Sequence, residues 1–520
     1  MTNQNYNILW ADDEIDLLKP HILFLEQKGC SITPVNSGGD AVDLCQSTFF
    51  DLIFLDENMP GMTGLETLEA IKQFRPNTPV VMITKSEEEY IMEEAIGAKI
   101  ADYLIKPINP SQILLSIKKL LDTKRIVTQK TNLSYQQEFQ SISSAIGDEL
   151  DHEDWADLYK KLIHWDLEIN QTEHKSMGDV MQMQKTEANV NFTKFIKANY
   201  LDWITGDNEE KPIFSDQLIK EKVIPHLSDE RPLFFFLIDN LRLDQWKELE
   251  PLISEYFTFE EDTTYFSILP TTTSYARNAI FAGMSPLDIS QKLPEYWVSD
   301  NEEEGKNNYE SELLGLQLKK YRPQTKYSYN KIIHTQQSKQ VLESLPNLMN
   351  NDLNAIVINF VDMLSHARTD LQMMKTLAPD EAAYRSLTKS WFLHSIWFEM
   401  LKFLANKDVE VIITTDHGTV RVQKPQKIVG DRNTNTNLRY KQGKSLNYDR
   451  KHVFGVADPE EIGLPKQEVS SSYAFASEDQ FFAYPNNYNH YVKYYKDTFQ
   501  HGGISLEEMI IPFVRMKPKN

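Results

Sequence analysis

Short apolar runs alternate with amphipathic stretches over residues 1–120 of the chain. The runs NILWADD, LIFLDENMPG, VVMITK and DYLIKP each pass from aliphatic and β-branched residues into polar ones. Runs of this length, separated by helix-like segments, indicate buried strands joined by helical crossovers. The pattern predicts an α/β domain with a small, doubly wound parallel sheet.

The hydrophobic pattern changes after residue 120. Residues 121–205 carry polar helical patterns such as YQQEFQSISSAI and DWADLYKKLIHWDLEI, with almost no glycine or proline. Their aromatic and aliphatic positions recur every three or four residues, which predicts a helical connector with its own packed side. The stretch GDNEEKP at residues 206–212 combines glycine, charge and proline and is typical of a linker.

A second α/β pattern begins at this linker, so we expect a further domain at residues 206–518. Its apolar runs include PLFFFLID, AIVINFVD and IITTDHG, each of which reaches an aspartate. Strands of an open parallel sheet end at one shared edge, which is where such folds place their sites. The chain is therefore predicted to have three parts, at residues 1–120, 121–205 and 206–518.

Composition narrows the class of protein. A chain of 520 residues has room for two to four domains, and its net charge of −22 argues against nonspecific binding of DNA or anionic membrane by the whole surface. The two cysteines, Cys30 and Cys45, favour a reducing compartment. The N-terminus lacks signal-peptide features, and no apolar run approaches the roughly 20 residues of a spanning helix. We expect a cytoplasmic protein without membrane insertion.

In the first domain, the residues that could bind a metal ion or a phosphoryl group lie at the ends of the predicted strands. Asp12 and Asp13 follow the first apolar run, Asp56 ends LIFLD, and Thr84 and Lys106 end the last two runs. Clustered carboxylates repel one another unless a divalent cation neutralises them, and hard oxygen ligands suit Mg²⁺. Asp56 can then accept a phosphoryl group, with Lys106 and Thr84 binding its oxygens.

The second domain offers aspartate and histidine ligands at its strand ends. These candidate ligands are Asp239, Asp362, His366, Asp416, His417 and His501. His366 follows Asp362 by four residues, so one helical turn brings both to the same side. His501 precedes two glycines, which let backbone approach closely. Carboxylates and imidazoles without thiolates suit Zn²⁺ and also fit Mn²⁺, so the pattern predicts a metal site.

Residues 421–451 form a basic insertion in this acidic chain. Nine lysines and arginines stand there against two acids, Asp431 and Asp449. The insertion follows Asp416-His417 closely, which favours recruitment of a phosphate-containing substrate, although a solvated loop is the alternative. The candidate substrate ligands are Arg439, Lys441 and Lys444. GKS at residues 443–445 is not a P-loop, because the upstream glycine and strand are missing.

The first domain resembles a response-regulator receiver domain of CheY-like fold. The matching motifs are DDE, LDENMPGMTG, IT and the Lys-Pro pair after DYLI, over about 120 residues. The resemblance implies Mg²⁺ bound by Asp12, Asp13, Asp56 and the Asn58 carbonyl, and phosphate taken by Asp56 from a cognate sensor histidine kinase. It further implies a switch pair of Thr84 and Tyr103 and a homodimer promoted by phosphorylation. Lys85 departs from the pattern, because receivers usually carry a small residue there.

The second domain resembles the PglZ-type branch of the alkaline phosphatase superfamily. The motifs are DNLRLDQW, TTTSYARNAIFAG, LRYKQGKSL and HGGISLEEMIIP, within residues 213–518. The resemblance implies an alkaline-phosphatase-like α/β fold and two Zn²⁺ or Mn²⁺ ions with separate ligand sets, namely Asp239, Thr273, Asp416 and His417 for one, and Asp362, His366 and His501 for the other. Receiver, helical connector and PglZ domain in this order resemble PorX-type regulators associated with type IX secretion.

The same resemblance implies a threonine nucleophile. Two metal ions roughly 4 Å apart support in-line displacement at phosphorus, with a covalent phosphothreonine that water then hydrolyses. Comparison of PTTTSYARNAIFAG with nucleotide phosphodiesterases of the superfamily favours Thr273, with Thr272 second and Thr271 third. From the residues alone, a threonine before a helix is more often an N-cap than a nucleophile.

Two functions follow from these patterns. The first is a response regulator whose phosphorylation controls a zinc phosphodiesterase or phosphatase acting on nucleotides or oligonucleotides. The second is a response regulator whose metal-bound PglZ domain serves as a protein-interaction module in secretion or transcription signalling, with a sigma factor or a secretion-system component as partner. A DNA-binding transcription factor is a weaker third, because the sequence shows no helix-turn-helix or basic recognition helix.

Overall fold

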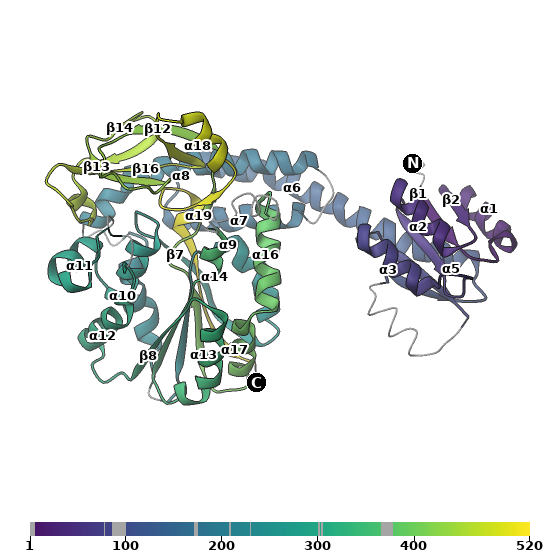
Figure 1. Ribbon diagram of the computed structural model, residues 1–520, viewed down its shortest axis with the longest axis horizontal. Coiled ribbons are helices and arrows are strands. Elements are labelled where there is room, and N and C mark those ends of the chain that lie inside the picture. Colours follow the sequence, from purple (N-terminus) through teal and green to yellow (C-terminus); the bar gives the residue numbers. More distant parts are fainter. Residues whose placement is uncertain are drawn as a thin grey trace. The chain divides into compact units, whose positions relative to one another are not determined.

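The computed structural model describes residues 6–76, 78–85, 100–170, 175–206, 210–228, 230–299, 302, 305–365 and 378–519 (Figure 1). The chain divides into two compact units, Met1–Gln136 and Gln137–Asn520. Among the described residues, every helix is too short or too polar to cross a membrane. Each unit contains one α/β domain, as the alternating hydrophobic pattern predicts.

The N-terminal unit is built on a five-stranded parallel sheet in the order β2-β1-β3-β4-β5. Its strands are β1 Tyr6–Ala11, β2 Cys30–Val35, β3 Leu52–Asp56, β4 Val80–Thr84 and β5 Asp102–Ile105. Its described helices are η1 Ile15–Leu18, α1 Lys19–Gln27, α2 Gly38–Ser47, α3 Gly64–Phe74, α5 Pro110–Ile117 and η2 Lys118–Asp122. This strand order is the doubly wound, CheY-like topology.

Alternate residues of the central strand β3 pack into two different hydrophobic clusters. Ile53 and Leu55 belong to one buried cluster, and Leu52 and Phe54 belong to the other. A strand buried on both faces reads as one continuous apolar run, which is why LIFLD lacks alternation. Because the last residue of that run is Asp56, the core itself holds the backbone of a candidate nucleophile.

The connector forms three long helices: α6 Thr123–Gly147, α7 His152–Asn170 and α8 Lys175–Thr205. α7 and α8 pack through aromatic rings, with the Trp155 and Phe192 ring centroids 5.5 Å apart. The division into units falls inside α6, so α7 and α8 belong to the same compact unit as the second α/β domain. The helical prediction for this part of the chain is therefore confirmed, and α7, α8 and the end of α6 share a unit with the domain after them.

The main sheet of the C-terminal unit has six strands in the order β7-β19-β10-β6-β9-β8. They are β6 Leu233–Ile238, β7 Phe257–Phe266, β8 Tyr327–Ile332, β9 Leu353–Ile358, β10 Glu410–Thr414 and β19 Ile510–Pro518. β10, β6, β9 and β8 run parallel, and β19 pairs antiparallel with both β10 and β7. A parallel sheet with an antiparallel edge is common in doubly wound folds.

Helices cover both faces of this sheet (Figure 1). Phe235 and Leu237 of β6 pack in a cluster with Ile280 and Phe281, while Phe236 points the other way toward Trp397. The described helices of this domain are η3 Ser215–Gln217, η4 Ile219–Val223, η5 Ile224–His226, α9 Leu243–Ile253, η6 Thr273–Arg277, α10 Asn278–Ala282, α11 Pro286–Lys292, η7 Pro294–Tyr296, α12 Glu310–Tyr321, α13 Thr335–Leu348, α14 Phe360–Ser365, α16 Glu381–Leu393, α17 Ile396–Leu404, η8 Pro459–Ile462, α18 Tyr488–Tyr495 and α19 Leu506–Met509.

Between β10 and β19 the chain forms a group of short strands, drawn in yellow-green with α18 in Figure 1. They are β11 Val420–Arg421, β12 Lys424–Val429, β13 Tyr440–Lys444, β14 Asn447–Tyr448, β15 Val453–Val456, β16 Ser471–Ala476, β17 Gln480–Ala483 and β18 Phe499–Gln500. β13, β16 and β15 form one sheet, and β14, β12 and β17 form another. Much of the basic insertion at 421–451 is therefore folded into strands.

Candidate metal centre and phosphorylation site

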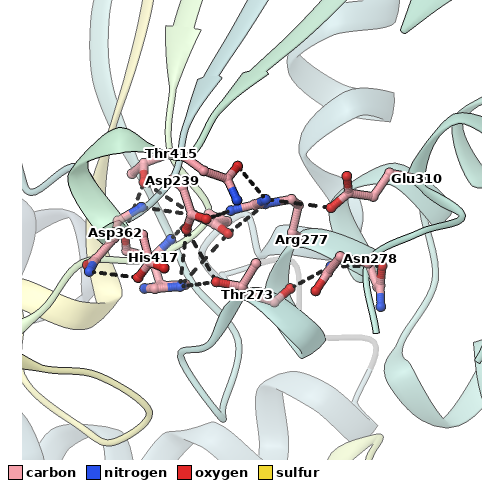
Figure 2. A network of polar contacts seen from close by, with 12 residues as sticks. Asp239, Thr273, Arg277, Asn278, Glu310, Asp362, Thr415 and His417 are labelled. Carbon is pink, nitrogen blue, oxygen red and sulfur yellow. Dashed lines mark hydrogen bonds and ion pairs between the residues drawn. The ribbon is translucent and has the colours of Figure 1, made fainter. Parts of the chain in front are cut away.

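Two strands of the main sheet, β6 and β10, deliver three polar side chains to one edge. Asp239 directly follows β6, while Asp416 and His417 follow β10 after one residue. All three side chains are buried. Their ligand atoms all lie within 4.8 Å of one another, and Figure 2 shows Asp239 and His417 turned toward a common point. The apolar strand runs thus bring these predicted ligands together at the carboxyl edge of the sheet.

Among the three threonines, Thr273 is the one that faces this point (Figure 2). Its Oγ1 lies 3.2 Å from Asp239 Oδ1 and 3.1 Å from His417 Nε2. Thr272 has an extended backbone, and its Oγ1 contacts Ser274 Oγ at 3.4 Å. Thr271 Oγ1 donates to the Gly503 carbonyl at 3.0 Å. The local fold therefore gives three chemically identical side chains different partners, and it directs Thr273 toward the metal centre.

Backbone carbonyls orient the two described histidines of the site. His417 Nδ1 lies 3.1 Å from the Gly418 carbonyl, and His501 Nδ1 lies 3.3 Å from the Thr271 carbonyl. A carbonyl oxygen only accepts hydrogen bonds, so Nδ1 carries the proton in both contacts. Nε2 is then the atom that each ring presents to the site. Metal-binding histidines are held in this way, through the ring nitrogen that does not bind the metal.

The second predicted ligand set is partly described. His501 Nε2 lies 3.7 Å from Asp362 Oδ1, and the His501 ring stacks on that of His417 with centroids 4.4 Å apart. Asn240 Nδ2 approaches Asp362 Oδ1 at 3.4 Å. His366, the remaining predicted ligand, lies outside the described residues. The two predicted sets thus meet side by side through their imidazole rings.

A buried arginine completes the site. Arg277 is fully buried; its Nε donates to Asp416 Oδ2 at 2.9 Å, and its Nη2 pairs with Asp239 Oδ2. Glu310 Oε1 lies 3.6 Å from its Nη1 (Figure 2). Burial acts to raise the pKa of Asp416, but the Arg277 guanidinium, assisted by His417, holds that pKa below its usual value.

The donor set fits a divalent cation. Burial raises the pKa of Asp239 well above its usual value, and the neighbouring carboxylates of Asp416 and Asp362 add to this, while Arg277 opposes it. Carboxylates crowded in a dry site need more positive charge than one arginine supplies. Carboxylate oxygens beside two imidazole nitrogens, without thiolates, are ligands that Zn²⁺ and Mn²⁺ accept.

The first domain also brings aspartates together at the ends of its strands. Ligand atoms of Asp12, Asp13 and Asp56 lie within 4.8 Å of one another. Lys106 Nζ lies 2.6 Å from Asp56 Oδ1 and 2.9 Å from Asp12 Oδ2. Burial and the Asp12 charge raise the pKa of Asp56, although Lys106 opposes this. These carboxylates fit the hard, oxygen-rich coordination that Mg²⁺ prefers.

The other predicted receiver residues lie on or just after strands β3, β4 and β5. Asn58 is exposed, and its N–H donates to Asp56 Oδ2 at 3.2 Å. Thr84 is buried at the end of β4, and Tyr103 on β5 is 39% exposed. The exposed Lys85 has its Nζ 3.6 Å from Glu14 Oε2. Residues 86–99, which follow Lys85, lie outside the described residues.

Three family models cover almost the whole chain. The model of the BREX system PglZ alkaline phosphatase-like domain matches residues 218–516, which is more than half of the chain. The chain belongs to the PglZ family. The PorX response regulator linker domain matches residues 125–204, and the response regulator receiver domain matches residues 8–118. This PglZ-family protein is a response regulator with the domain set of the PorX type.

Curated relatives of this PglZ-family protein match about a quarter of the chain, a length close to that of its receiver domain. The transcriptional regulatory protein ResD of Bacillus subtilis is 32% identical over 120 residues, which is 23% of this chain and 49% of ResD. AlgB of Pseudomonas putida is 35% identical over 119 residues, 23% of this chain and 27% of AlgB. The chain thus spans half or less of the length of these relatives. Among solved structures, CheY4 of Vibrio cholerae is 28% identical over 22% of this chain and 99% of CheY4, with a TM-score of 0.22.

The candidate substrate ligands of this PglZ-family protein have partners within the protein. Arg439 is fully buried and its guanidinium binds the Glu508 carboxylate and the Ser477 carbonyl. Lys441 is also buried, and its Nζ donates to the Asn435 carbonyl at 2.8 Å. Lys444 pairs with Glu468. Substrate binding by Arg439, Lys441 and Lys444 stays a prediction; in the structure, Arg439 and Lys441 are buried beside or within β13.

The sequence prediction missed Arg277 although a signal was present. Arg277 follows Thr273 by four residues in TTTSYAR, so one helical turn places both side chains on the same side. Its fully buried position between Asp239 and Asp416 makes it part of the centre. A buried arginine needs carboxylate partners, and strand-end aspartates were the partners that the sequence already offered.

Proposed function

We propose that this protein is a two-component response regulator whose phosphorylation controls a zinc-dependent phosphodiesterase or phosphatase acting on nucleotide-like substrates. The observation that carries this proposal is the position of Thr273 Oγ1, 3.1 Å from His417 Nε2 and 3.2 Å from Asp239 Oδ1. A hydroxyl held among the ligand atoms of a metal centre is placed to act as a nucleophile. In this proposal the protein is cytoplasmic, and it regulates type IX secretion.

Two divalent ions would be held by the residues of the proposed centre. When bound, they supply Lewis-acid stabilisation of negative charge on the attacking and leaving oxygens. One ligand set is Asp239, Thr273, Asp416 and His417, and the other is Asp362, His366 and His501. Zn²⁺ is favoured by the histidine-carboxylate donors, and Mn²⁺ is the second choice.

The protein residues then perform a double displacement. Asp239 Oδ1 accepts a hydrogen bond from Thr273 and so orients the hydroxyl. A new bond forms between Thr273 Oγ and phosphorus while the bond from phosphorus to the leaving oxygen breaks; the proton lost by Thr273 balances the one gained by the leaving alcohol. Water then attacks the phosphothreonine, releases the phosphate product and restores the hydroxyl.

The receiver domain would supply control. Asp56 accepts the phosphoryl group from a cognate sensor histidine kinase, with Mg²⁺ held by Asp12, Asp13, Asp56 and the Asn58 carbonyl. Lys106, which already lies 2.6 Å from Asp56 Oδ1, would bind a phosphoryl oxygen. Thr84 and Tyr103 would carry the change to the surface of the domain and promote a homodimer.

Metal content and turnover of the full chain test this function together. Purified protein is analysed for zinc and assayed with a bis-nitrophenyl phosphodiester, then with mononucleotides and short oligonucleotides, with and without beryllofluoride. We expect about two zinc ions per chain and turnover that Thr273→Val abolishes. Zinc binding without turnover of any phosphoester would contradict the enzyme and favour a binding role in which a sigma factor or a secretion-system component is the partner.

A further inference from the structure

A buried group of charges joins the connector to the PglZ domain. It is formed by side chains of α7, α8, α9, α16 and α19 and by the residue before α9. We call it the connector cluster; its members are Asp166, Lys185, Asn189, Arg242, Asp244, Glu381, Arg385 and Glu507. Most of these side chains are almost fully buried. Buried charges are retained only where partners satisfy them, so their arrangement is specific.

Lys185 is the cation that the connector contributes. Its Nζ lies 2.6 Å from Glu381 Oε2 and 3.4 Å from Asp166 Oδ2. Burial acts to lower the pKa of Lys185, but these carboxylates raise it above its usual value, so the side chain stays charged. Arg242 Nη2 reaches the same Glu381 oxygen at 3.3 Å. One carboxylate oxygen therefore connects helix α8 to the segment that follows β6 and Asp239.

Asn189 makes a second connection one helical turn later on α8. Its Nδ2 donates to Glu507 Oε2 at 3.0 Å, and its Oδ1 accepts from the Leu506 N–H at 2.8 Å. Both partners lie at the start of α19, in the segment that begins with His501. Helix α8 thus contacts the segment that follows Asp239 through Glu381, and it contacts the segment that follows His501 directly.

Gly418 links both connections to His417. A Cβ added at Gly418 would lie 1.9 Å from the Glu507 carbonyl oxygen and 3.4 Å from Arg242 Cγ. Gly418 is therefore packed between the Arg242 side chain and the Glu507 backbone, in a gap that accepts only glycine. Its own carbonyl accepts from His417 Nδ1 at 3.1 Å. The orientation of the His417 ring thus depends on the two residues that Lys185 and Asn189 restrain.

From these contacts we infer that Lys185 and Asn189 are positioning residues for the metal centre, and that α8 forms part of the catalytic unit. Each acts through another residue, Lys185 through Glu381 and Arg242, and Asn189 through Glu507. Both routes end at Gly418, whose carbonyl fixes the His417 tautomer. The inference rests on the proposed function in one respect, because it assumes that His417 binds a metal ion.

The test compares four variants of the full chain with the wild type. Lys185→Met and Asn189→Ala remove the two connections, Lys185→Arg keeps the charge, and Lys194→Met changes an exposed lysine on the same helix. A cavity of about 140 Å³ lined by Lys185, Glu381 and Glu507 leaves room for the larger guanidinium. Zn²⁺ affinity is measured by chelator competition without substrate, followed by kcat and KM with the nitrophenyl diester.

We expect Lys185→Met and Asn189→Ala to bind Zn²⁺ roughly 10-fold more weakly, within the range for loss of residues that orient metal ligands. The value of kcat should fall while KM stays unchanged, because substrate contacts are left intact. Lys185→Arg should recover most of the affinity, and Lys194→Met should match the wild type. A residue that only held helices together would lower the melting temperature and leave the Zn²⁺ affinity of the folded protein unchanged.

Affinities within twofold of the wild type in folded Lys185→Met and Asn189→Ala would overturn the inference. Circular dichroism and thermal melting establish folding, and if Lys185→Met does not fold, the smaller change Asn189→Ala decides alone. The proposed function fails separately, because a wild type that binds Zn²⁺ without hydrolysing phosphoesters contradicts the enzyme and leaves the affinity comparison intact. A wild type that binds no Zn²⁺ contradicts both.

Discussion

Arg277 Nε donates a 2.9 Å hydrogen bond to Asp416 Oδ2, and neither side chain has measurable exposure to solvent. The same guanidinium pairs with Asp239, so one arginine contacts two proposed metal ligands. It therefore balances part of their charge and fixes the carboxylate oxygens that it binds. The second oxygen of Asp239, Oδ1, accepts a hydrogen bond from Thr273, and the second oxygen of Asp416, Oδ1, accepts from the backbone N–H groups of Asn240 and His417.

Replacing Arg277 with methionine should destabilise the metal-free protein more than the metal-loaded one. Two buried carboxylates lose their cation, and breaking a buried pair costs about 3–5 kcal/mol. Zn²⁺ in excess should recover part of this loss, because it binds only the folded centre. Urea unfolding with a chelator and with Zn²⁺ measures both states, with Arg277→Lys as the charge-retaining control. An equal loss of unfolding free energy with and without Zn²⁺ would contradict the prediction that Arg277 and a bound metal ion neutralise the same carboxylates.

Acid should destabilise the connector cluster through Asp244. Burial acts to raise the pKa of Asp244, but Arg242 and Arg385 hold the pKa below its usual value. Its stabilising contribution is therefore complete above the unfolded-state pKa of about 4 and is lost as pH falls toward the lower folded-state value. Asp244→Asn should reduce stability at pH 7 and flatten the decline in stability below about pH 4.

Tryptophan fluorescence during urea unfolding at several pH values can measure this effect. Trp10 lies in the N-terminal unit and the other seven of the eight tryptophans lie in the C-terminal unit, so the signal reports mainly on the latter. Asp157→Asn, on an exposed position of α7, is the control and should keep the wild-type pH profile. If the free energy of unfolding of Asp244→Asn declines below about pH 4 as steeply as that of the wild type, the prediction is wrong.

The sequence predicted the strand-end positions because they follow from local chemistry. A buried β-branched run that stops at Asp239 or at Asp416 can be recognised without its neighbours, and parallel strands bring such ends to one edge. The choice among the three threonines could not be made in this way. It depends on the turn into η6 and on Gly503, which accepts the hydrogen bond of Thr271 from 232 positions away.

Long-range charge pairing explains the remaining differences. Arg439 was predicted to bind substrate because its neighbours are basic, and no local pattern indicated its partner Glu508, which lies 69 positions further along the chain. Lys185 likewise finds Glu381 at a separation of 196 positions. Helical periodicity identifies the packed side of α8 but does not reveal which charge lies opposite each residue. Buried ion pairs across distant segments are therefore invisible to a pattern read along one chain.

Asp56 should be the sole phosphoacceptor of the receiver domain. It ends β3 within contact of Lys106, and Asp12, which follows the neighbouring strand β1, is paired with the same lysine. Incubation with acetyl phosphate and Mg²⁺, followed by intact mass measurement, should show one phosphoryl group on the wild type and none on Asp56→Ala. Asp13→Asn should still accept phosphate, at higher Mg²⁺ concentration. Stoichiometric uptake by Asp56→Ala would place the acceptor elsewhere.

Phosphorylation should promote a homodimer through the surface beside Tyr103. Thr84 is buried at the end of β4, and Tyr103 on the next strand is 39% exposed. Phosphate on Asp56 would draw the Thr84 hydroxyl inward and let the Tyr103 ring follow, which changes packing on that face. Light scattering should give a doubled mass with beryllofluoride for the wild type and a monomer for Asp56→Ala. An unchanged mass of the wild type would count against this mechanism.

The three threonines provide the sharpest test of the catalytic centre. Thr273→Val deletes the proposed nucleophile but only one oxygen ligand, so metal content should stay near two while phosphodiester turnover falls by at least roughly three orders of magnitude. Thr272→Val is the matched control, because Thr272 contacts Ser274 rather than the centre, and it should keep most of the turnover. Metal analysis beside the hydrolysis assay separates a lost nucleophile from a lost metal. Full activity in the Thr273 variant with loss in Thr272→Val would move the nucleophile by one residue, and full activity in both would remove the covalent mechanism.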